Sequence, residues 1–308
     1  MASPREQLRR ALSAGEPIVA PGVHDPLLGR IIQRMEFKAC YVGGWMTGAH
    51  LATTEPLTTL TEQVEVAGRI ARAVDIPVIC DANAGFGDPI QVLRTVREFE
   101  DAGIAAIHIE DQVYPKRVSY HRGLEHVVPF EEFLTKIRYA LDARRDPDFM
   151  IIGRTDAGTA IGGSWAEAVR RVKALEELGV DMVMPMTRTV EEMLTFRELY
   201  PNPKRPLLTT AYFNGPTVNE LHALGFQAMI YPLATIVASV DAVLRLYAGL
   251  NETGSLSFDQ QQALEVREEI KAAIDMPLYY QIEDATTERG VQPGKSGSPG
   301  LEGGLDRG

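Results

Sequence analysis

The sequence predicts an α/β protein built as a (β/α)8 barrel of the TIM type. Short apolar runs, typical of buried β-strands, alternate with longer segments of helical period as far as about residue 250. Strands that alternate with helices pair in parallel through right-handed crossovers, and eight such units close a barrel. An open, doubly wound sheet is the alternative, but no glycine-rich phosphate turn follows the first predicted strand.

Eight segments are expected to form the strands, and amphipathic stretches between them are expected to form helices. In the stretch 164–179, Ser164 is the expected N-cap and Gly179 the residue that ends the helix. The predicted strands are 17–23, 39–44, 77–82, 105–110, 149–154, 181–186, 206–210 and 226–232, and the clearest helices are 60–74, 89–103, 130–145 and 164–179.

The two ends of the chain carry further predicted features. The first 17 residues have the composition of a short charged helix. Residues 257–285 are expected to be helical, and Tyr279 and Tyr280 suggest that this part packs on something, such as a neighbouring subunit. The last stretch is rich in glycine and serine. We therefore expect one barrel domain over 1–285, including C-terminal helices, and a disordered tail over 286–308.

Composition argues against several classes of function. The 308 residues carry a formal net charge of −11 without a basic stripe, which disfavours nucleic acid and anionic membranes as partners. No run approaches the ~18 apolar residues of a membrane span, and the N-terminus lacks the apolar core of a signal peptide. Cys40 and Cys80 lie in apolar segments and are expected to be buried thiols. A cytoplasmic protein is expected.

Charged residues follow several of the predicted strands. Asp81 ends the third strand, Glu110 the fourth and Arg154 the fifth, while Gly43 and Gly44 end the second. The active site of such a barrel forms at the C-terminal ends of its strands, so these groups should converge. Carboxylate oxygens suit Mg²⁺ or Mn²⁺, and an arginine suits a substrate carboxylate or oxyanion. Alternatively, these charges only pair with one another.

Two of the predicted loops are unusually long, one after the second strand and one after the fourth. Long loops in compact domains are usually functional or disordered. The second loop collects cations above the expected metal site, which indicates a mobile lid over an anion, with a solvated surface loop as the alternative. Its candidate residues are Lys116, Arg117, Tyr120, His121, Arg122 and His126.

Three motifs in the same order resemble those of the isocitrate lyase/phosphoenolpyruvate mutase superfamily. They are D-A-N-A-G-F-G at 81–87, H-I-E-D-Q-V at 108–113 followed by Pro115-Lys116-Arg117, and D-P-D-F-M-I-I-G-R-T-D-A at 146–157. I-Y-P-L at 230–233 also matches. The resemblance covers roughly residues 5–285 and is nearest to the branch of 2-methylisocitrate lyase and carboxyphosphonoenolpyruvate mutase.

The resemblance implies a fold, a cofactor and a set of site residues. It implies Mg²⁺ near Asp81, Asn83 and Glu110, and a last helix swapped between subunits of a tetramer, that is, a dimer of helix-swapped dimers. The substrate would be a small carboxylate. Its reaction would pass through a pyruvate-like enolate held by Gly44, Trp45 and Arg154. The expected catalytic residues are Lys116, Ser119, Tyr120, His121 and Arg154, and the expected substrate-binding residues are Tyr41, Gly43, Gly44, Trp45, Met186, Thr210 and Tyr212.

The chain departs from the superfamily pattern at the outer half of this site. Val118 stands where the lyases have a proton-donating cysteine, and Tyr120, His121 or Ser119 could replace it as general acid. Asn83 replaces an aspartate, and Glu55-Pro56 displaces a carboxylate by one position. Met186, Thr210 and Tyr212 replace a glutamate, an asparagine and a threonine of the lyases, and Trp45 replaces a small residue. These changes predict a bulkier, apolar substrate arm.

Several functions remain open from the sequence alone. The first is a carbon–carbon lyase of the retro-aldol type acting on a 2-hydroxy (di)carboxylic acid. The second is a decarboxylase or hydrolase of a β-keto acid such as oxaloacetate, favoured by the missing cysteine. A phosphonate mutase is weakened by Val118. A non-catalytic barrel that binds a metabolite is disfavoured by Asp81, Glu110, Lys116 and Arg154 taken together.

Overall fold

The computed structural model describes residues 2–117 and 121–287, and close contacts divide the chain into two units, Met1–Ser257 and Phe258–Gly308. The first unit holds the barrel, and the second holds the helices α11 (Gln260–Ala273) and α12 (Met276–Ala285). Helix is thus confirmed across most of 257–285. The extent of the barrel domain to residue 285 stays a prediction. The predicted tail lies outside the described residues from 288 onward.

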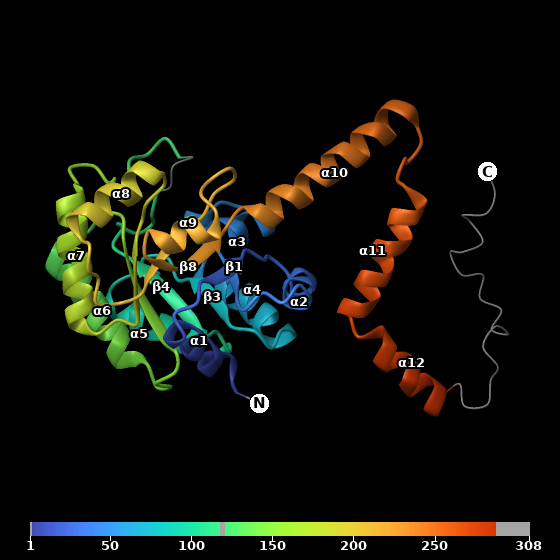
Figure 1. The fold of residues 1–308 in the computed structure, drawn as a ribbon, viewed down its shortest axis with the longest axis horizontal. Coiled ribbons are helices and arrows are strands. Elements are labelled where there is room, and N and C mark those ends of the chain that lie inside the picture. The colour runs from blue at the N-terminus through green and yellow to red at the C-terminus, as the bar shows by residue number, and fades with distance from the viewer. Residues whose placement is uncertain (1, 118–120, 288–308) are drawn as a thin grey trace. The chain divides into compact units, whose positions relative to one another are not determined.

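Eight parallel strands form the sheet of the first unit, in the order β1-β8-β7-β6-β5-β4-β3-β2 (Figure 1). A parallel bridge between Gly22 and Tyr41 joins the end of β1 to β2, so the ring is nearly closed. The predicted barrel is confirmed, and each strand lies within two residues of its expected ends. The strands are β1 (Ile18–Pro21), β2 (Cys40–Val42), β3 (Val78–Asp81), β4 (Ala106–Glu110), β5 (Met150–Thr155), β6 (Met182–Pro185), β7 (Leu207–Thr210) and β8 (Phe226–Tyr231).

Helices surround this ring, as the amphipathic pattern predicts. Ser164 accepts a hydrogen bond from the backbone N–H of Glu167, and Gly179 ends the same helix at φ +92°, so both predicted caps are confirmed. The helices of this unit are α1 (Pro4–Ser13), α2 (Pro26–Arg34), α3 (Gly44–His50), η1 (Glu55–Leu57, a 3-10 turn), α4 (Leu60–Ala73), α5 (Pro89–Asp101), α6 (Phe130–Ala143), α7 (Trp165–Leu178), α8 (Val190–Leu199), α9 (Val218–Ala223) and α10 (Ala234–Thr253).

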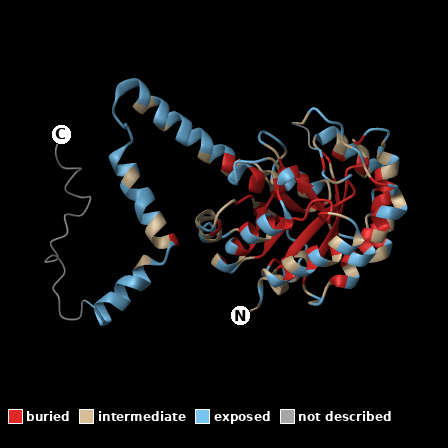
Figure 2. Cartoon of the chain, turned by 180° about the vertical axis from the view of Figure 1, so that it is seen from behind, coloured by how far each residue is buried: buried red, intermediate tan, exposed pale blue. Residues whose placement is uncertain are grey.

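Side chains that alternate along the strands fill two layers of core. On β5, Ile152 belongs to the cluster inside the barrel, whereas Ile151 belongs to the cluster between the strands and the helices. Figure 2 shows the strands as the buried centre of this unit. Leu8 of α1 joins the inner cluster, and Arg5 of α1 pairs with Asp146 in the loop that precedes β5. Helix α1 therefore covers the N-terminal end of the barrel and leaves the C-terminal end for the site.

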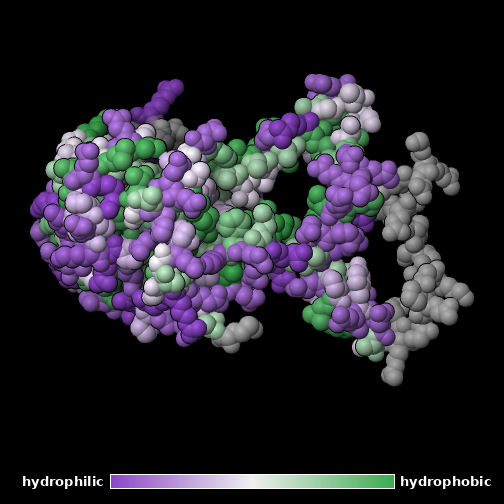
Figure 3. Space-filling view, in the orientation of Figure 1, coloured by the Kyte–Doolittle hydropathy of each residue, from purple (hydrophilic) through white to green (hydrophobic). Residues whose placement is uncertain are grey.

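The outer surface of the barrel unit is mainly hydrophilic in the view of Figure 3, but α10 exposes several apolar side chains. Val240, Leu244 and Tyr247 are each more than half exposed along this helix. No described helix is both long enough and apolar enough to cross a membrane.

Candidate active site

The charged side chains predicted at the strand ends lie together at the C-terminal end of the barrel. Asp81 and Glu110 are the last residues of β3 and β4, and Arg154 is the penultimate residue of β5. Glu110 is in register with Arg154, and Asp81 with His108. Because neighbouring strands lie about 4.8 Å apart, side chains from these strand ends reach a common space.

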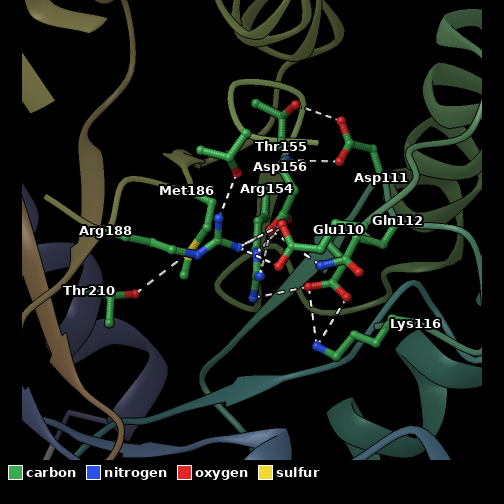
Figure 4. A network of polar contacts seen from close by, with 12 residues as sticks. Glu110, Asp111, Gln112, Lys116, Arg154, Thr155, Asp156, Met186, Arg188 and Thr210 are labelled. Carbon is green, nitrogen blue, oxygen red and sulfur yellow. Dashed lines mark hydrogen bonds and ion pairs between the residues drawn. The ribbon is translucent and has the colours of Figure 1, made fainter. Parts of the chain in front are cut away.

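The ammonium group of Lys116 lies among three carboxylates. Its Nζ is 2.6 Å from Glu55 Oε1, 3.0 Å from Glu110 Oε1 and 3.5 Å from Asp81 Oδ2. Figure 4 shows Lys116 beside Glu110, with Arg154 contacting the same carboxylate. Although Lys116 belongs to a long loop, it is only 1% exposed. A buried ammonium requires such partners because the loss of hydration is otherwise costly.

Glu55 is a site residue that the sequence analysis did not place among the candidate ligands. It begins η1, in the long loop after β2, and is 3% exposed. A Cβ added at Gly44 would lie 2.1 Å from Glu55 Oε1. Any side chain at position 44 would therefore force the Glu55 side chain to move. With glycine there, this carboxylate reaches the site despite its displacement by one position along the sequence.

Arg154 is held in a fixed orientation by two acidic side chains. Its Nε and Nη2 each donate a hydrogen bond of 2.9 Å to Asp156, and its Nη1 lies 2.9 Å from Glu110 Oε2. A bidentate arginine–carboxylate pair fixes the plane of the guanidinium. Gln112 also donates to Asp156, at 3.2 Å. The orientation of the Arg154 guanidinium is thus fixed by protein contacts, and the side chain lines the cavity.

A buried pair of rings lies on the other side of Asp81. The Tyr41 hydroxyl and His108 Nε2 are 2.9 Å apart, and His108 Nδ1 is 3.7 Å from Asp81 Oδ1. Burial lowers the pKa of His108 to about 4, so its imidazole is neutral near pH 7. Burial raises the pKa of Tyr41 well above its usual value, so its hydroxyl keeps its proton. Tyr41 is therefore a hydrogen-bond donor rather than a base.

A cavity of about 470 Å³ is lined by both charged and apolar residues. The charged residues are Glu55, Asp81, Lys116 and Arg154. All seven predicted substrate-binding residues line the cavity. The other lining residues, which the sequence analysis did not single out, are mainly apolar: Met46, Met184, Ile230, Pro232 and Leu233. This lining suits a ligand that carries both an anionic group and an apolar group.

Burial and crowding shift the ionisation of the acidic groups. Burial raises the pKa of Glu55 to about 8 and that of Glu110 to about 7, although nearby cations oppose both shifts. Burial also acts to raise the pKa of Asp81, but the charge of Lys116, together with smaller contributions from Arg154 and other neighbours, outweighs burial and holds this pKa below its usual range. The raised pKa values of Glu55 and Glu110 thus limit the negative charge that the three carboxylates carry around Lys116 near pH 7.

The residues present fit a hard divalent cation by their chemistry. Oxygen ligands from carboxylates and amides are those that Mg²⁺ prefers. Both side-chain atoms of Asn83 are buried without a hydrogen-bond partner, and its backbone N–H donates to Asp81 Oδ1 at 2.7 Å. However, no three acidic, histidine or cysteine side chains in the described chain are arranged to hold a metal as they stand. The ammonium of Lys116 lies where the carboxylates meet.

The predicted proton donors of the long loop after β4 do not line the described cavity or lie outside the described residues. His121 Nε2 is 3.1 Å from Thr54 Oγ1, beside Glu55, and it does not line the described cavity. Ser119 and Tyr120, like Val118, lie outside the described residues. The predicted lid therefore stays a prediction. His108 and Asp156 are site residues that the sequence analysis did not select, although both lie inside the motifs that carried the resemblance.

Known proteins resemble the chain over most of its length. A family model described as phosphoenolpyruvate phosphomutase matches residues 8–250. The chain belongs to the phosphoenolpyruvate mutase/isocitrate lyase superfamily. 2,3-Dimethylmalate lyase of Eubacterium barkeri is 39% identical over 256 residues, covering 79% of this chain and 85% of that protein. Probable 2-methylisocitrate lyase 1 of Corynebacterium glutamicum is 37% identical and covers 82% of this chain and 83% of its own length.

The solved structures agree with this membership. Phosphonopyruvate hydrolase, crystallised with oxalate and Mg²⁺, has a TM-score of 0.83 and 30% identity, and the match covers 93% of this chain and 100% of that one. The superfamily thus includes lyases and hydrolases that act on carboxylates. The predicted superfamily and the prediction of a lyase-type enzyme are confirmed. The role of each individual residue stays a prediction.

Proposed function

We propose that the protein is a Mg²⁺-dependent carbon–carbon lyase that acts on a 2-hydroxy (di)carboxylic acid with an apolar arm. The observation that carries this proposal is the mixed lining of the cavity, in which Arg154 and Lys116 provide positive charge and Met184, Met186 and Leu233 provide apolar surface. Two relatives that are lyases support the reaction class. Mn²⁺ is the alternative metal.

Arg154 is assigned to the substrate carboxylate. Asp156 fixes its guanidinium, so little reorganisation is needed when the anion binds. The backbone N–H groups of Gly44 and Trp45 are assigned to the oxyanion that develops during the reaction. Asp81, Glu110 and Asn83 would hold the metal together with Glu55. When bound, Mg²⁺ supplies positive charge that stabilises a developing oxyanion.

The proposed cleavage is a retro-aldol reaction. The substrate hydroxyl loses its proton, its oxygen forms a carbonyl, and the electron pair of the adjacent carbon–carbon bond passes to the leaving carbon. That carbanion, in its enolate form, then takes up a proton. Cys40 and Cys80, the only cysteines of the sequence, are both buried and do not line the cavity. Tyr120, His121 and Ser119 are therefore the proposed proton donors, with Lys116 as a further catalytic group.

A decarboxylase or hydrolase of a β-keto acid such as oxaloacetate is the second candidate. The absence of a cysteine at the cavity favours it, because no thiol can protonate a leaving carbanion there. The similarity to phosphonopyruvate hydrolase supports the same reaction class. Product analysis separates the lyase from the decarboxylase, since a lyase yields two carbon fragments and a decarboxylase yields carbon dioxide.

The proposed assembly is a homo-oligomer of helix-swapped dimers. Its support is the row of apolar side chains that α10 exposes, among them Val240, Leu244 and Tyr247. Light scattering of the full chain should give a mass above that of one chain, and Leu244→Glu should lower it. A monomeric wild type would contradict this proposal. The cytoplasmic location also stays a prediction.

Calorimetric titration of oxalate, with and without Mg²⁺, tests the enolate half of the site. Oxalate resembles the planar carboxylate–enolate unit, so the test does not depend on knowing the substrate. Binding that requires Mg²⁺ and disappears in Asp81→Ala is the expected result. A screen of 2-hydroxy and β-keto acids with apolar arms then follows. A folded protein that binds no oxalate with Mg²⁺ would argue for the metabolite-binding alternative.

A further inference from the structure

Lys116 occupies the position that a cation between the site carboxylates would need. Its Nζ is within 3.5 Å of oxygens from Glu55, Glu110 and Asp81 at once. Mg²⁺ contacts its oxygen ligands at about 2.0–2.1 Å and requires near-octahedral geometry. The same oxygens cannot surround both Mg²⁺ and an ammonium at this distance. As they stand, the described carboxylates offer no ready metal site.

We propose that Lys116 is an internal counter-ion of the metal-free enzyme, and that Mg²⁺ binds by displacing its ammonium from the three carboxylates. This inference rests on the proposed Mg²⁺ dependence and adds an order of events to it. Before the metal binds, the ammonium of Lys116 is paired with the three carboxylates and is shielded from solvent. Once the metal holds the carboxylates, the ammonium becomes available to the substrate.

The structure provides a place for the displaced ammonium. Lys116 lines the cavity of about 470 Å³, as Arg154 does. A lysine side chain has a flexible stem of four carbons, so its ammonium group can change partners with little movement of the backbone. An anionic substrate in the same cavity would be a new partner for it. Metal and substrate would then bind in that order, with each step preparing the next.

Two other lysines of the chain serve as internal references. Lys136 on α6 is 4% exposed, and its Nζ is 3.4 Å from the carbonyl oxygen of Ala84. It is buried like Lys116 but lies outside the carboxylate cluster. Lys38 pairs with Glu16 on the surface, where its side chain is 55% exposed. The first should stay protected from an amine reagent, and the second should stay reactive, whether or not Mg²⁺ is present.

The test is trace acetylation of the full-length protein during a Mg²⁺ titration without substrate, read by peptide mass spectrometry at constant ionic strength. Labelling of Lys116 is expected to rise by about tenfold or more, equivalent to about 1.4 kcal/mol. Its midpoint should match the Mg²⁺ dissociation constant from calorimetry, while Lys136 and Lys38 keep their rates. Mg²⁺ binding with Lys116 still protected would overturn the displacement but leave the proposed function intact. No Mg²⁺ binding would overturn both.

A variant provides a second measurement. Lys116→Met removes the competing charge and nearly preserves the volume of the side chain, so Mg²⁺ affinity should rise by about tenfold or more, again about 1.4 kcal/mol. Lys38→Met is the matched control and should not change it. An unchanged affinity in a folded Lys116→Met protein would overturn the proposal. If this variant does not fold, the labelling of the wild type decides alone.

Discussion

Arg188 contacts both carboxylate oxygens of Glu125, at 2.6 and 2.8 Å, and so links the loop after β6 to the long loop after β4. The same guanidinium donates to Thr159 at 2.6 Å, in the loop after β5. It also lies 3.8 Å from Asp156, the carboxylate that fixes Arg154. One side chain thus connects three loops of the active-site face to the proposed anion-binding arginine.

Replacing Arg188 with alanine should therefore affect ligand binding through Asp156. We expect the Arg188→Ala protein to bind oxalate roughly fivefold more weakly in the presence of Mg²⁺, which corresponds to about 1 kcal/mol. The free energy of unfolding should fall by about 1 kcal/mol, because the pair with Glu125 is only partly exposed. Calorimetry and chemical denaturation measure the two effects.

An exposed pair provides the control for this substitution. Arg69 and Glu65 form an i,i+4 pair on α4, with side chains 63% and 55% exposed. Arg69→Ala should leave oxalate affinity unchanged and have little effect on stability. In the double variant Arg188→Ala/Glu125→Ala, the losses in oxalate affinity should not add, since both changes break one contact. Additive losses would show that the two residues act independently.

The planar guanidinium of Arg154, and not only its positive charge, should be needed for oxalate binding. Arg154→Lys keeps the positive charge but cannot make the bidentate contact with Asp156 while also contacting Glu110. We expect oxalate affinity to fall by about a hundredfold, the lower end of the loss for a preorganised oxyanion donor. Arg171→Lys is the control, because Arg171 makes a buried contact with Asp111 behind the site. It should reduce stability and leave oxalate binding largely unchanged.

The site residues that could be predicted from the strand pattern are those that lie at the ends of β-strands. Asp81, Glu110 and Arg154 follow from the strand pattern alone, because parallel strands in register bring their C-terminal ends together. Glu55 and Lys116 lie in long loops, where no periodicity relates sequence position to location in space. Their burial against each other depends on the space left by Gly44, which only the folded structure reveals.

The apolar lining of the cavity shows the same contrast. Met186, Thr210 and Tyr212 were predicted from their places in the superfamily pattern, and all three line the cavity. Pro232 and Leu233 follow β8 and were quoted only as part of a motif, without a role. Met46 lies in the first turn of α3, a segment that was expected to be part of a long loop. A short helix within a long loop leaves too little pattern to be recognised.

The metal-free protein should lose stability as the pH rises toward 8. Burial raises the pKa of Glu55 to about 8 and of Glu110 to about 7, so the folded state holds protons that the unfolded state releases above about pH 4.5. The stabilisation is present at low pH and is lost as the pH passes these folded-state values. Chemical denaturation in the presence of a chelator, between pH 5 and 8, measures this loss. The free energy of unfolding should fall by up to about 1.4 kcal/mol per pH unit for each group.

Two comparisons test the origin of this pH dependence. In the Glu55→Gln variant the side chain at position 55 cannot ionise. The free energy of unfolding should therefore fall less steeply as the pH approaches 8. Saturating Mg²⁺ should have the same effect, because the metal stabilises the ionised carboxylates. A stability profile unchanged by both treatments would assign the dependence to other groups.

Met186 should control which substrate arms the cavity accepts. Its sulfur is 3.9 Å from Thr210 Oγ1, and both residues line the cavity together with other apolar residues. Met186→Glu would place a carboxylate in this apolar lining, so the KM for 2-hydroxy acids with apolar arms should rise at least about tenfold, as expected for an unpaired polar group facing an apolar ligand. Oxalate affinity should stay the same, because oxalate needs only the charged residues. A loss of oxalate binding in the folded variant would instead mean that the charged and the apolar residues of the cavity do not act separately, and the proposed division between an enolate half and an apolar half would be wrong.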